Sequence, residues 1–205
     1  MANAITLVRI PLLVGIVVLL HHPNPWVRLA LAPTIAVLIV MDGIDGIIAR
    51  KRDKTSVLGS VLDIAADRTV ELVFWVVFAD LNLIPLAVPV IVLIRGVFVD
   101  AIRSIAPAHG LAPFELMRTE LGRFLVKSPW LRTPYAVVKA VAFVLLAMQS
   151  AVSVVPPFLN PGGNGLNIAA QIATWISVLF CIVRGVPVLV EGSIVLAEQE
   201  EDDAE

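Results

Sequence analysis

Residues 42–67 read DGIDGIIARKRDKTSVLGSVLDIAAD, and this stretch decides both the fold and the chemistry. It consists of two largely apolar halves joined by a short charged segment. Each half carries two carboxylates at short spacing, Asp42 and Asp45 in the first half and Asp63 and Asp67 in the second. At about 100° per residue the first pair lies about 60° apart on a helix, and the second pair stacks at i and i+4. We therefore predict two antiparallel neighbouring helices that bring four carboxylates together.

Such a cluster of acids has to be neutralised. Two carboxylates ~4 Å apart repel by ~4 kcal/mol at an effective dielectric of 20, and four of them form several such pairs. Hard divalent cations prefer oxygen ligands, and Mg²⁺ binds through few carboxylates together with substrate phosphates. We therefore expect two ions of Mg²⁺ or Mn²⁺, which would stabilise the attacking and leaving oxygens of a phosphoryl-group displacement. The other interpretation is a helix-end network of ion pairs between these acids and Arg50, Lys51, Arg52 and Arg68.

The composition places the chain in a membrane. Of the 205 residues 59% are apolar and 16% are charged, whereas soluble domains have about 45–50% and about 25%. These proportions exclude an ordinary soluble globule and a disordered chain, and the single cysteine, Cys181, excludes a disulfide scaffold. We expect a location in the cell (inner or plasma) membrane and no nucleic-acid partner.

Six stretches are apolar enough to cross a bilayer, because a span needs roughly 20 mostly apolar residues. Pro, Gly or charged segments separate them, with a solvated turn at His21 and His22. Residues 111–127 have the pattern of an amphipathic surface helix. The sequence predicts an all-α, polytopic membrane protein with six transmembrane helices in one domain, residues 1–197. The predicted spans are residues 5–20, 27–49, 58–80, 84–105, 132–156 and 166–190.

The distribution of charge predicts the orientation. Basic residues concentrate in segments 50–54 and 104–131, whereas the loops on the other side contribute only Arg28. By the positive-inside rule, both termini and the acidic cluster then face the cytoplasm. Six of the 17 acidic residues lie in residues 198–205, which we expect to form a disordered cytoplasmic tail.

The spacing within residues 42–67 resembles a known signature. Written as D-x2-D-G-x2-A-R-x8-G-x3-D-x3-D, it is similar at every fixed position to the signature of the CDP-alcohol phosphatidyltransferase family. The resemblance implies a six-helix membrane enzyme, commonly a homodimer, with its active site facing the cytoplasm. Such an enzyme transfers a phosphatidyl group from CDP-diacylglycerol, or a related CDP-lipid, to an alcohol and releases CMP.

The same resemblance implies roles for individual residues. The implied metal ligands are Asp42, Asp45 and Asp63, with Asp67 completing the metal shell or acting as general base on the acceptor hydroxyl. The implied CDP-lipid site comprises Gly46, Ala49, Arg50 and Gly59, with Asn3 and Thr6 from an N-terminal element. The chain offers no strong candidate for a covalent nucleophile, so we expect direct displacement at phosphorus.

Arginines in or beside the later spans need an anionic partner. An unpaired cation at the centre of a span costs about 2.5–3.5 kcal/mol even on the lenient insertion scale. Acids there are few: Glu71, Asp100 and Glu191. The excess of cations indicates an acceptor that carries its own phosphate, although snorkelling to lipid headgroups is the alternative for long basic side chains. The predicted phosphate-binding residues are Arg95, Arg103, Arg132 and Arg184.

The later spans resemble the phosphatidylglycerophosphate synthase-like branch of the family most, which implies glycerol 3-phosphate as acceptor. A motif of that branch, Gly-Lys-x-Lys-Thr, is absent; Leu131-Arg132-Thr133 stands in its place. Inositol phosphate or another alcohol is therefore the alternative acceptor. Two more distant alternatives are an intramembrane prenyltransferase, which also holds Mg²⁺-diphosphate with two Asp-rich motifs, and a cation-binding transporter.

Overall fold

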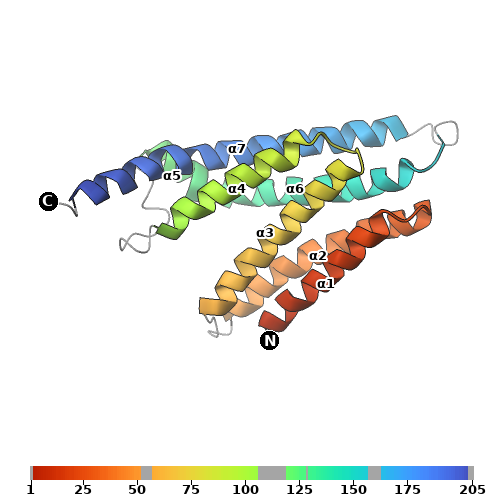
Figure 1. The fold of residues 1–205 in the computed structure, drawn as a ribbon, viewed down its shortest axis with the longest axis horizontal. Coiled ribbons are helices and arrows are strands. Elements are labelled where there is room, and N and C mark those ends of the chain that lie inside the picture. The colour runs from red at the N-terminus through yellow and green to blue at the C-terminus, as the bar shows by residue number, and fades with distance from the viewer. Residues whose placement is uncertain (1, 52–56, 106–118, 128, 157–162, 203–205) are drawn as a thin grey trace. The chain divides into compact units, whose positions relative to one another are not determined.

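The structure is a computed structural model that describes residues 2–51, 57–105, 119–127, 129–156 and 163–202 (Figure 1). Over these residues the regular structure is helical and no strand occurs, which confirms the all-α prediction. Each predicted span overlaps one long helix, and the predicted surface helix 111–127 ends in α5, its first part lying outside the described residues. The helices are α1 (Ala2–Leu20), α2 (Pro25–Lys51), α3 (Val57–Asp80), α4 (Ala87–Ile105), α5 (Glu120–Lys127), α6 (Pro129–Val152) and α7 (Gly163–Asp202).

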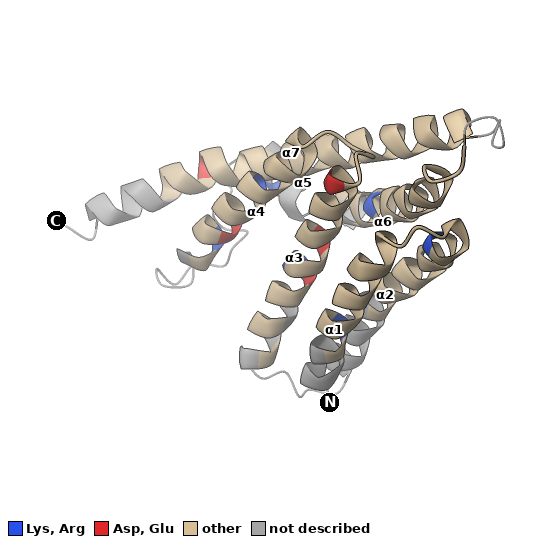
Figure 2. Cartoon of the chain, turned by 45° about the vertical axis from the view of Figure 1, so that its right-hand side comes forward, with Lys and Arg blue, Asp and Glu red and all other residues tan. Residues whose placement is uncertain are grey.

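Two stretches among the described residues are long and apolar enough to cross a membrane, Thr133–Val152 in α6 and Gly163–Val195 in α7. Val8–Leu20 and Pro25–Met41 are shorter apolar helices. Figure 2 shows charged residues as isolated positions among uncharged ones along the described helices. Large apolar side chains are also widely exposed, as contact with hydrocarbon requires. These features indicate a membrane protein, while the number of spans and the orientation stay predictions.

The chain divides into two compact units. The first comprises Met1–Pro89 with Ala140–Ala173, and the second Val90–Lys139 with Thr174–Glu205. Helices α6 and α7 therefore each contribute to both units. The division assigns the four aspartates of the signature to the first unit and the four candidate phosphate-binding arginines to the second.

In the first unit, α1 packs against both α2 and α3 (Figure 1). Thus α1 is a shared neighbour of the two helices that were predicted to form a hairpin. An aromatic cluster joins α3 to α6. The centroid of the Phe143 ring lies 5.3 Å from that of Phe74 and 4.6 Å from that of Trp75, and the Trp75 pair is edge-on. Edge-to-face aromatic pairs are favourable beyond their burial, so this cluster holds α3 at a defined place in the unit.

The end of α3 is fixed by a Schellman arrangement at Asn82. Its φ of 58° is left-handed, a conformation that Asn tolerates better than most residues. The Asn82 N–H donates to the Ala79 carbonyl and the Leu83 N–H to the Phe78 carbonyl, as this cap requires. The Gln171 amide of α7 donates to the Leu83 carbonyl. The turn after α3 is therefore held by backbone hydrogen bonds to α3 and by a side-chain hydrogen bond from α7.

Helix α7 extends beyond the predicted span of residues 166–190. It continues into the acidic segment as far as Asp202, and the cytoplasmic tail of residues 198–205 stays a prediction. Helix propensity is high for Ala197, Gln199 and three glutamates, Glu198, Glu200 and Glu201, which extend a helix that is already formed. Continuing an existing helix avoids the cost of nucleation, so propensity outweighs the repulsion of like charges here.

The turn between α1 and α2 is more specifically built than the predicted solvated turn. His21 Nε2 lies 3.0 Å from Asp80 Oδ2, and Nδ1 lies 2.8 Å from the Val17 carbonyl oxygen. A ring that meets an acceptor at each nitrogen donates from both, which is the protonated form. Arg28 is buried and donates to the carbonyls of His22 and Ser150. These bonds connect the turn to α3 and α6.

The His21–Asp80 pair predicts a pH dependence of stability. The hydrogen bond to Asp80, then that to the Val17 carbonyl, raise the pKa of His21 above its ordinary 6.5, against desolvation and the charge of Arg28. Because the pKa of His21 is higher in the folded state, the pair contributes its full stabilisation of the fold below about pH 6.5. This stabilisation is lost as the pH rises through the raised pKa of the folded protein. Exposed pairs contribute about 0.2–1 kcal/mol.

We therefore expect the Tm of the wild type to fall more than that of His21→Gln between about pH 6 and about pH 9. Equal pH dependence in the two proteins contradicts this prediction.

Candidate active site

The signature aspartates lie on two consecutive helices of the first unit. Asp42 and Asp45 belong to the last part of α2, and Asp63 and Asp67 to the first half of α3. The side chains of the first three lie outside the described residues, so their convergence stays a prediction. Asp67 is described: it is partly buried and has an interaction partner within the chain.

The donor set of this region fits a hard divalent cation. Its only metal-ligating side chains are carboxylates, and oxygen donors without thiolate or imidazole suit Mg²⁺ or Mn²⁺. Among the described side chains, no group of three or more His, Cys, Asp or Glu is placed to hold a metal. Of the four aspartates only Asp67 is among the described side chains, so the fit rests on the chemistry of the donors.

Two further charged residues of the first unit are deeply buried, and sequence reasoning missed the importance of both. Glu71, one turn beyond Asp67 on α3, is 3% exposed and lies 3.5 Å from Arg68 Nη1. Arg9 of α1 is 1% exposed, and α1 packs against α3. Buried charges are retained where they are paired or functional. The i, i+4, i+8 spacing of Asp63, Asp67 and Glu71 was the available signal.

The residues of the predicted CDP-lipid site are spread over three helices of the same unit. Gly59 lies in the first turn of α3 and is partly buried. The others lie on helical backbone with their side chains outside the described residues: Asn3 and Thr6 on α1, and Gly46, Ala49 and Arg50 on α2. Because α1 contacts both α2 and α3, the three helices that carry these residues are neighbours.

In the second unit, Arg95 of α4 is packed directly on α7. A Cβ placed on Gly185 would lie 2.6 Å from Arg95 Cγ and 3.0 Å from its Nε. The absence of a side chain at Gly185 thus makes room for the stem of Arg95, beside Arg184 in the sequence. The Arg95 Nε is buried and has no hydrogen-bond partner among the described residues. A buried guanidinium nitrogen in this state is suited to a phosphate oxygen.

The remaining candidate arginines belong to the same unit. Arg184 is 9% exposed on α7, and Arg103 lies in the last turn of α4, where a cation is also favoured by the helix dipole. Arg132 lies on α6, with its side chain outside the described residues. It is one turn before Tyr135, whose ring contacts Phe180 of α7 at 6.4 Å. The structure thus brings Arg95 to α7 but does not show the four arginines meeting.

Glu191 binds the N-terminus of α5. Its Oε2 accepts from the Thr119 N–H at 3.0 Å and its Oε1 from the Thr119 hydroxyl at 2.6 Å. The Thr119 hydroxyl in turn accepts from the Gly122 N–H at 2.9 Å, which makes Thr119 the N-cap of α5. A Cβ on Gly122 would lie 2.5 Å from Glu191 Oε1, so a side chain there would displace the carboxylate. The helix dipole also stabilises a carboxylate at the N-terminus of α5.

This cap predicts the effect of replacing Thr119. Thr119→Val removes the hydroxyl that caps α5, at a cost of about 0.5–2 kcal/mol. We expect faster hydrogen exchange of the amides of residues 120–127 in the reconstituted protein, whereas Thr119→Ser retains the wild-type rate. Gly122→Ala should resemble Thr119→Val, because its methyl group displaces the Glu191 carboxylate. Unchanged exchange in all three variants contradicts the proposed cap.

Over the described residues the fold is all-helical and has the features of a membrane protein. The signature aspartates lie on α2 and α3, and the candidate arginines lie later in the sequence, on α4, α6 and α7. Comparison with known families then identifies the class of the protein. The family described as CDP-alcohol phosphatidyltransferase matches residues 1–183. The chain therefore belongs to the CDP-alcohol phosphatidyltransferase family, a family of transferases for phosphate-containing groups. A search of curated proteins gave no significant match.

Proposed function

We propose that this protein transfers the phosphatidyl group of CDP-diacylglycerol, or a related CDP-lipid, to glycerol 3-phosphate and releases CMP. The observation that carries the reaction type is the complete spacing of the signature from Asp42 to Asp67 within a chain of this family. The family membership supports transfer of a phosphatidyl group from a CDP-alcohol. The acceptor, the metal ligands and the cytoplasmic orientation are the finer parts of the proposal.

The aspartates supply the metal site in this proposal. Asp42, Asp45, Asp63 and Asp67 would hold Mg²⁺ or Mn²⁺, which when bound supplies positive charge for the diphosphate of the CDP-lipid. Asp67 has a second role open to it, that of accepting the proton of the attacking hydroxyl. A carboxylate near cations is a weak base, so its contribution to proton transfer comes late, and electrostatic stabilisation is the larger effect.

The neighbouring residues complete the nucleotide end of the site. Gly46 and Gly59 leave the backbone uncovered, so that a diphosphate can come close to it. Arg50 carries a permanent charge suited to phosphate. Asn3 and Thr6 lie on α1, the helix that packs against both α2 and α3. These residues bind and orient the leaving CMP, and direct attack by the acceptor oxygen inverts the configuration at phosphorus.

A phosphorylated acceptor is favoured by the second unit. Arg95 and Arg184 lie on helices brought together at Gly185, and the buried Arg95 Nε has no hydrogen-bond partner among the described residues. A phosphate monoester can accept from such a group, whereas a neutral alcohol cannot balance its charge. Arg103 and Arg132 are the other proposed contacts. Inositol phosphate satisfies the same chemistry and is the alternative acceptor.

The reaction is tested with purified protein, CDP-diacylglycerol, Mg²⁺ or Mn²⁺ and a set of paired acceptors. Glycerol 3-phosphate and inositol phosphate are compared with glycerol and inositol, and both CMP and the lipid product are measured. We expect CMP with a phosphorylated acceptor only, and none after chelation of the metal. Release of CMP with the neutral alcohols alone contradicts the proposed acceptor, and absence of CMP with every acceptor contradicts the reaction.

Two features of the proposal have their own measurements. Direct displacement predicts inversion at a chiral phosphorus, so retention of configuration would indicate a covalent enzyme intermediate. The proposed homodimer is tested by the mass of the protein in lipid nanodiscs, where a monomeric mass contradicts it.

A further inference from the structure

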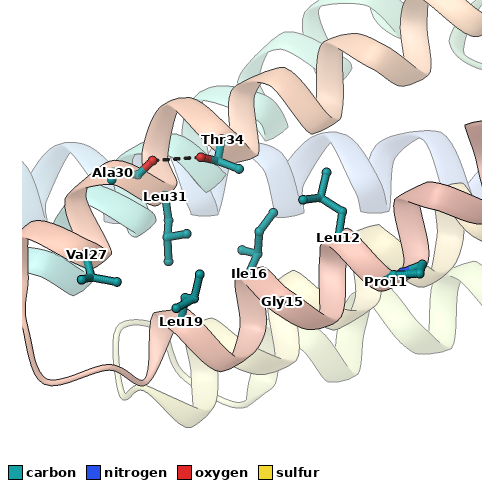
Figure 3. A pocket seen from close by; sticks show the side chains of 9 residues that line it. All are labelled: Pro11, Leu12, Gly15, Ile16, Leu19, Val27, Ala30, Leu31 and Thr34. Carbon is teal, nitrogen blue, oxygen red and sulfur yellow. Dashed lines mark hydrogen bonds between the residues drawn. The ribbon is translucent and has the colours of Figure 1, made fainter.

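An open apolar cavity lies between α1 and α2 in the first unit (Figure 3). Its volume is about 460 Å³, within the range of small-molecule sites. Eight of its nine lining residues are apolar or glycine, and the ninth, Thr34, donates its hydroxyl to the Ala30 carbonyl at 2.9 Å. The lining residues are Pro11, Leu12, Gly15, Ile16, Leu19, Val27, Ala30, Leu31 and Thr34. The lining side chains thus leave no hydrogen-bond donor for a polar ligand.

The dimensions of the cavity select a thin occupant. From Pro11 to Leu19 it follows α1 for about 12 Å at 1.5 Å per residue, which is close to the thickness of one hydrocarbon leaflet of about 15 Å. Spread over that length, its volume of about 460 Å³ corresponds to a cross-section of about 40 Å². A helix about 10 Å across needs about 80 Å². The cavity therefore matches a hydrocarbon chain in cross-section, whereas a helix of another chain would enter it only in part.

The surroundings indicate a lipid environment. Beyond the cavity, Val8 and Val37 continue the apolar surface and are 59% and 57% exposed. At its other end lies Trp26, 75% exposed, next to the polar turn of residues 21–24. An exposed Trp beside a polar turn is typical of the boundary between hydrocarbon and headgroups. The cavity thus runs from the level of the headgroups into the hydrocarbon.

We propose that this cavity binds one acyl chain of a bilayer phospholipid, with the headgroup beside Trp26 and the turn that precedes it. The CDP-lipid substrate is a less suitable source of the chain. Along α2, the cavity ends at Thr34, eight residues or about 12 Å before Asp42, and its polar end is the end farther from the aspartates. The proposal is independent of the acceptor and of the metal.

Gly15 offers a direct test, because no atom lies within 4 Å of a Cβ placed there. Gly15→Ala adds one methyl group in open space, whereas Gly15→Leu and Gly15→Phe fill the cavity progressively. Val14→Phe is the matched control: Val14 is on the same helix, is 57% exposed and does not line the cavity. The Tm of each variant shows whether it folds, and Gly15→Leu keeps the test valid where Gly15→Phe does not fold.

The measurement is photo-crosslinking in vesicles of palmitoyl-oleoyl phosphatidylethanolamine and phosphatidylglycerol. The probe is phosphatidylcholine with a diazirine on one acyl chain, and labelled peptides are identified by mass spectrometry. We expect labelling of residues 11–19 and 27–34 in the wild type, Gly15→Ala and Val14→Phe. Labelling should fall to the level of the other exposed apolar surfaces in Gly15→Leu and Gly15→Phe.

Three outcomes overturn the proposal. Equal labelling of the cavity in all variants shows that no chain is bound there specifically. Loss of the label on addition of excess CDP-diacylglycerol assigns the cavity to the substrate instead of a bilayer lipid. Loss of a dimer in Gly15→Phe, with lipid labelling unchanged, assigns it to a second copy of the chain. Labelling that resists CDP-diacylglycerol and follows the size of residue 15 supports it.

Discussion

Replacing Asp67 by asparagine is expected to lower kcat by about 10²- to 10⁴-fold, the range that a positioned acid or base contributes. The substitution keeps the size of a partly buried side chain and removes its charge. The side chain then neither accepts a proton nor neutralises a cation. The measurement is CMP release from CDP-diacylglycerol with glycerol 3-phosphate in the reconstituted protein.

Asp80→Asn is the matched control for this prediction. Asp80 lies on the same helix, at its other end, and pairs with His21. Its substitution should leave kcat unchanged and affect only the pH dependence of stability. Wild-type turnover in Asp67→Asn would show that the proposed site is wrong, whatever the state of the control.

The two roles open to Asp67 can be separated by the same variant. A lost metal ligand is partly compensated by raising the concentration of Mg²⁺, because binding follows mass action. A lost general base is not, and it instead removes the acidic limb of the pH–rate profile. Recovery at high Mg²⁺ therefore assigns Asp67 to the metal shell, and a changed pH profile without recovery assigns it to proton transfer.

Replacing Arg95 by glutamine is expected to raise the KM for glycerol 3-phosphate by about 10- to 100-fold, since a hydrogen bond to a charged group contributes about 1.5–3 kcal/mol. The KM for CDP-diacylglycerol should stay unchanged, because that substrate is proposed to bind in the first unit. The KM of Arg95→Lys for glycerol 3-phosphate should lie between those of the wild type and Arg95→Gln, since an ammonium keeps the charge but loses the bidentate geometry. Initial rates at varied acceptor concentration measure the effect.

Gly185→Ala tests the same residue without removing its charge. The added methyl group would lie 2.6 Å from Arg95 Cγ, so the arginine stem has to move. The KM for the acceptor should rise in this variant too, by less than in Arg95→Gln. Lys139→Gln is the control, because it removes a cation of the same unit that lies over the Tyr135 ring. A similar rise in the control would show that only overall charge matters.

Much of the helical structure was predictable, because it depends on local sequence. Apolar runs of about 20 residues, ended by proline, glycine or charge, predicted every long helix, and all but α7 within a few residues. The ends were predicted less well: α7 continues beyond residue 190 to Asp202, and the exposed His21 turn is in addition bonded to Asp80 of α3. Both features concern polar residues whose environment depends on what precedes or faces them.

The candidate site was predictable as chemistry and not as geometry. The signature of residues 42–67 predicted the acids, the glycines and the family, and the excess of arginines indicated an anionic acceptor. No local pattern indicated that Glu191 caps α5 through Thr119, or that Gly185 accommodates Arg95. These pairs are separated by about 70 to 90 residues, so no local spacing encodes them.

The sequence alone determined that the chain is helical, has the composition of a membrane protein and carries a phosphatidyl-transfer signature, since these follow from composition and short-range spacing. Only the tertiary structure decided which helix faces meet: α1 between α2 and α3, Arg95 on Gly185, and the open cavity beside Gly15. The physical reason is that helices in hydrocarbon are apolar on nearly every side. Without a polar face turned to water, periodicity does not tell the buried side from the lipid-facing side, and close packing makes that choice.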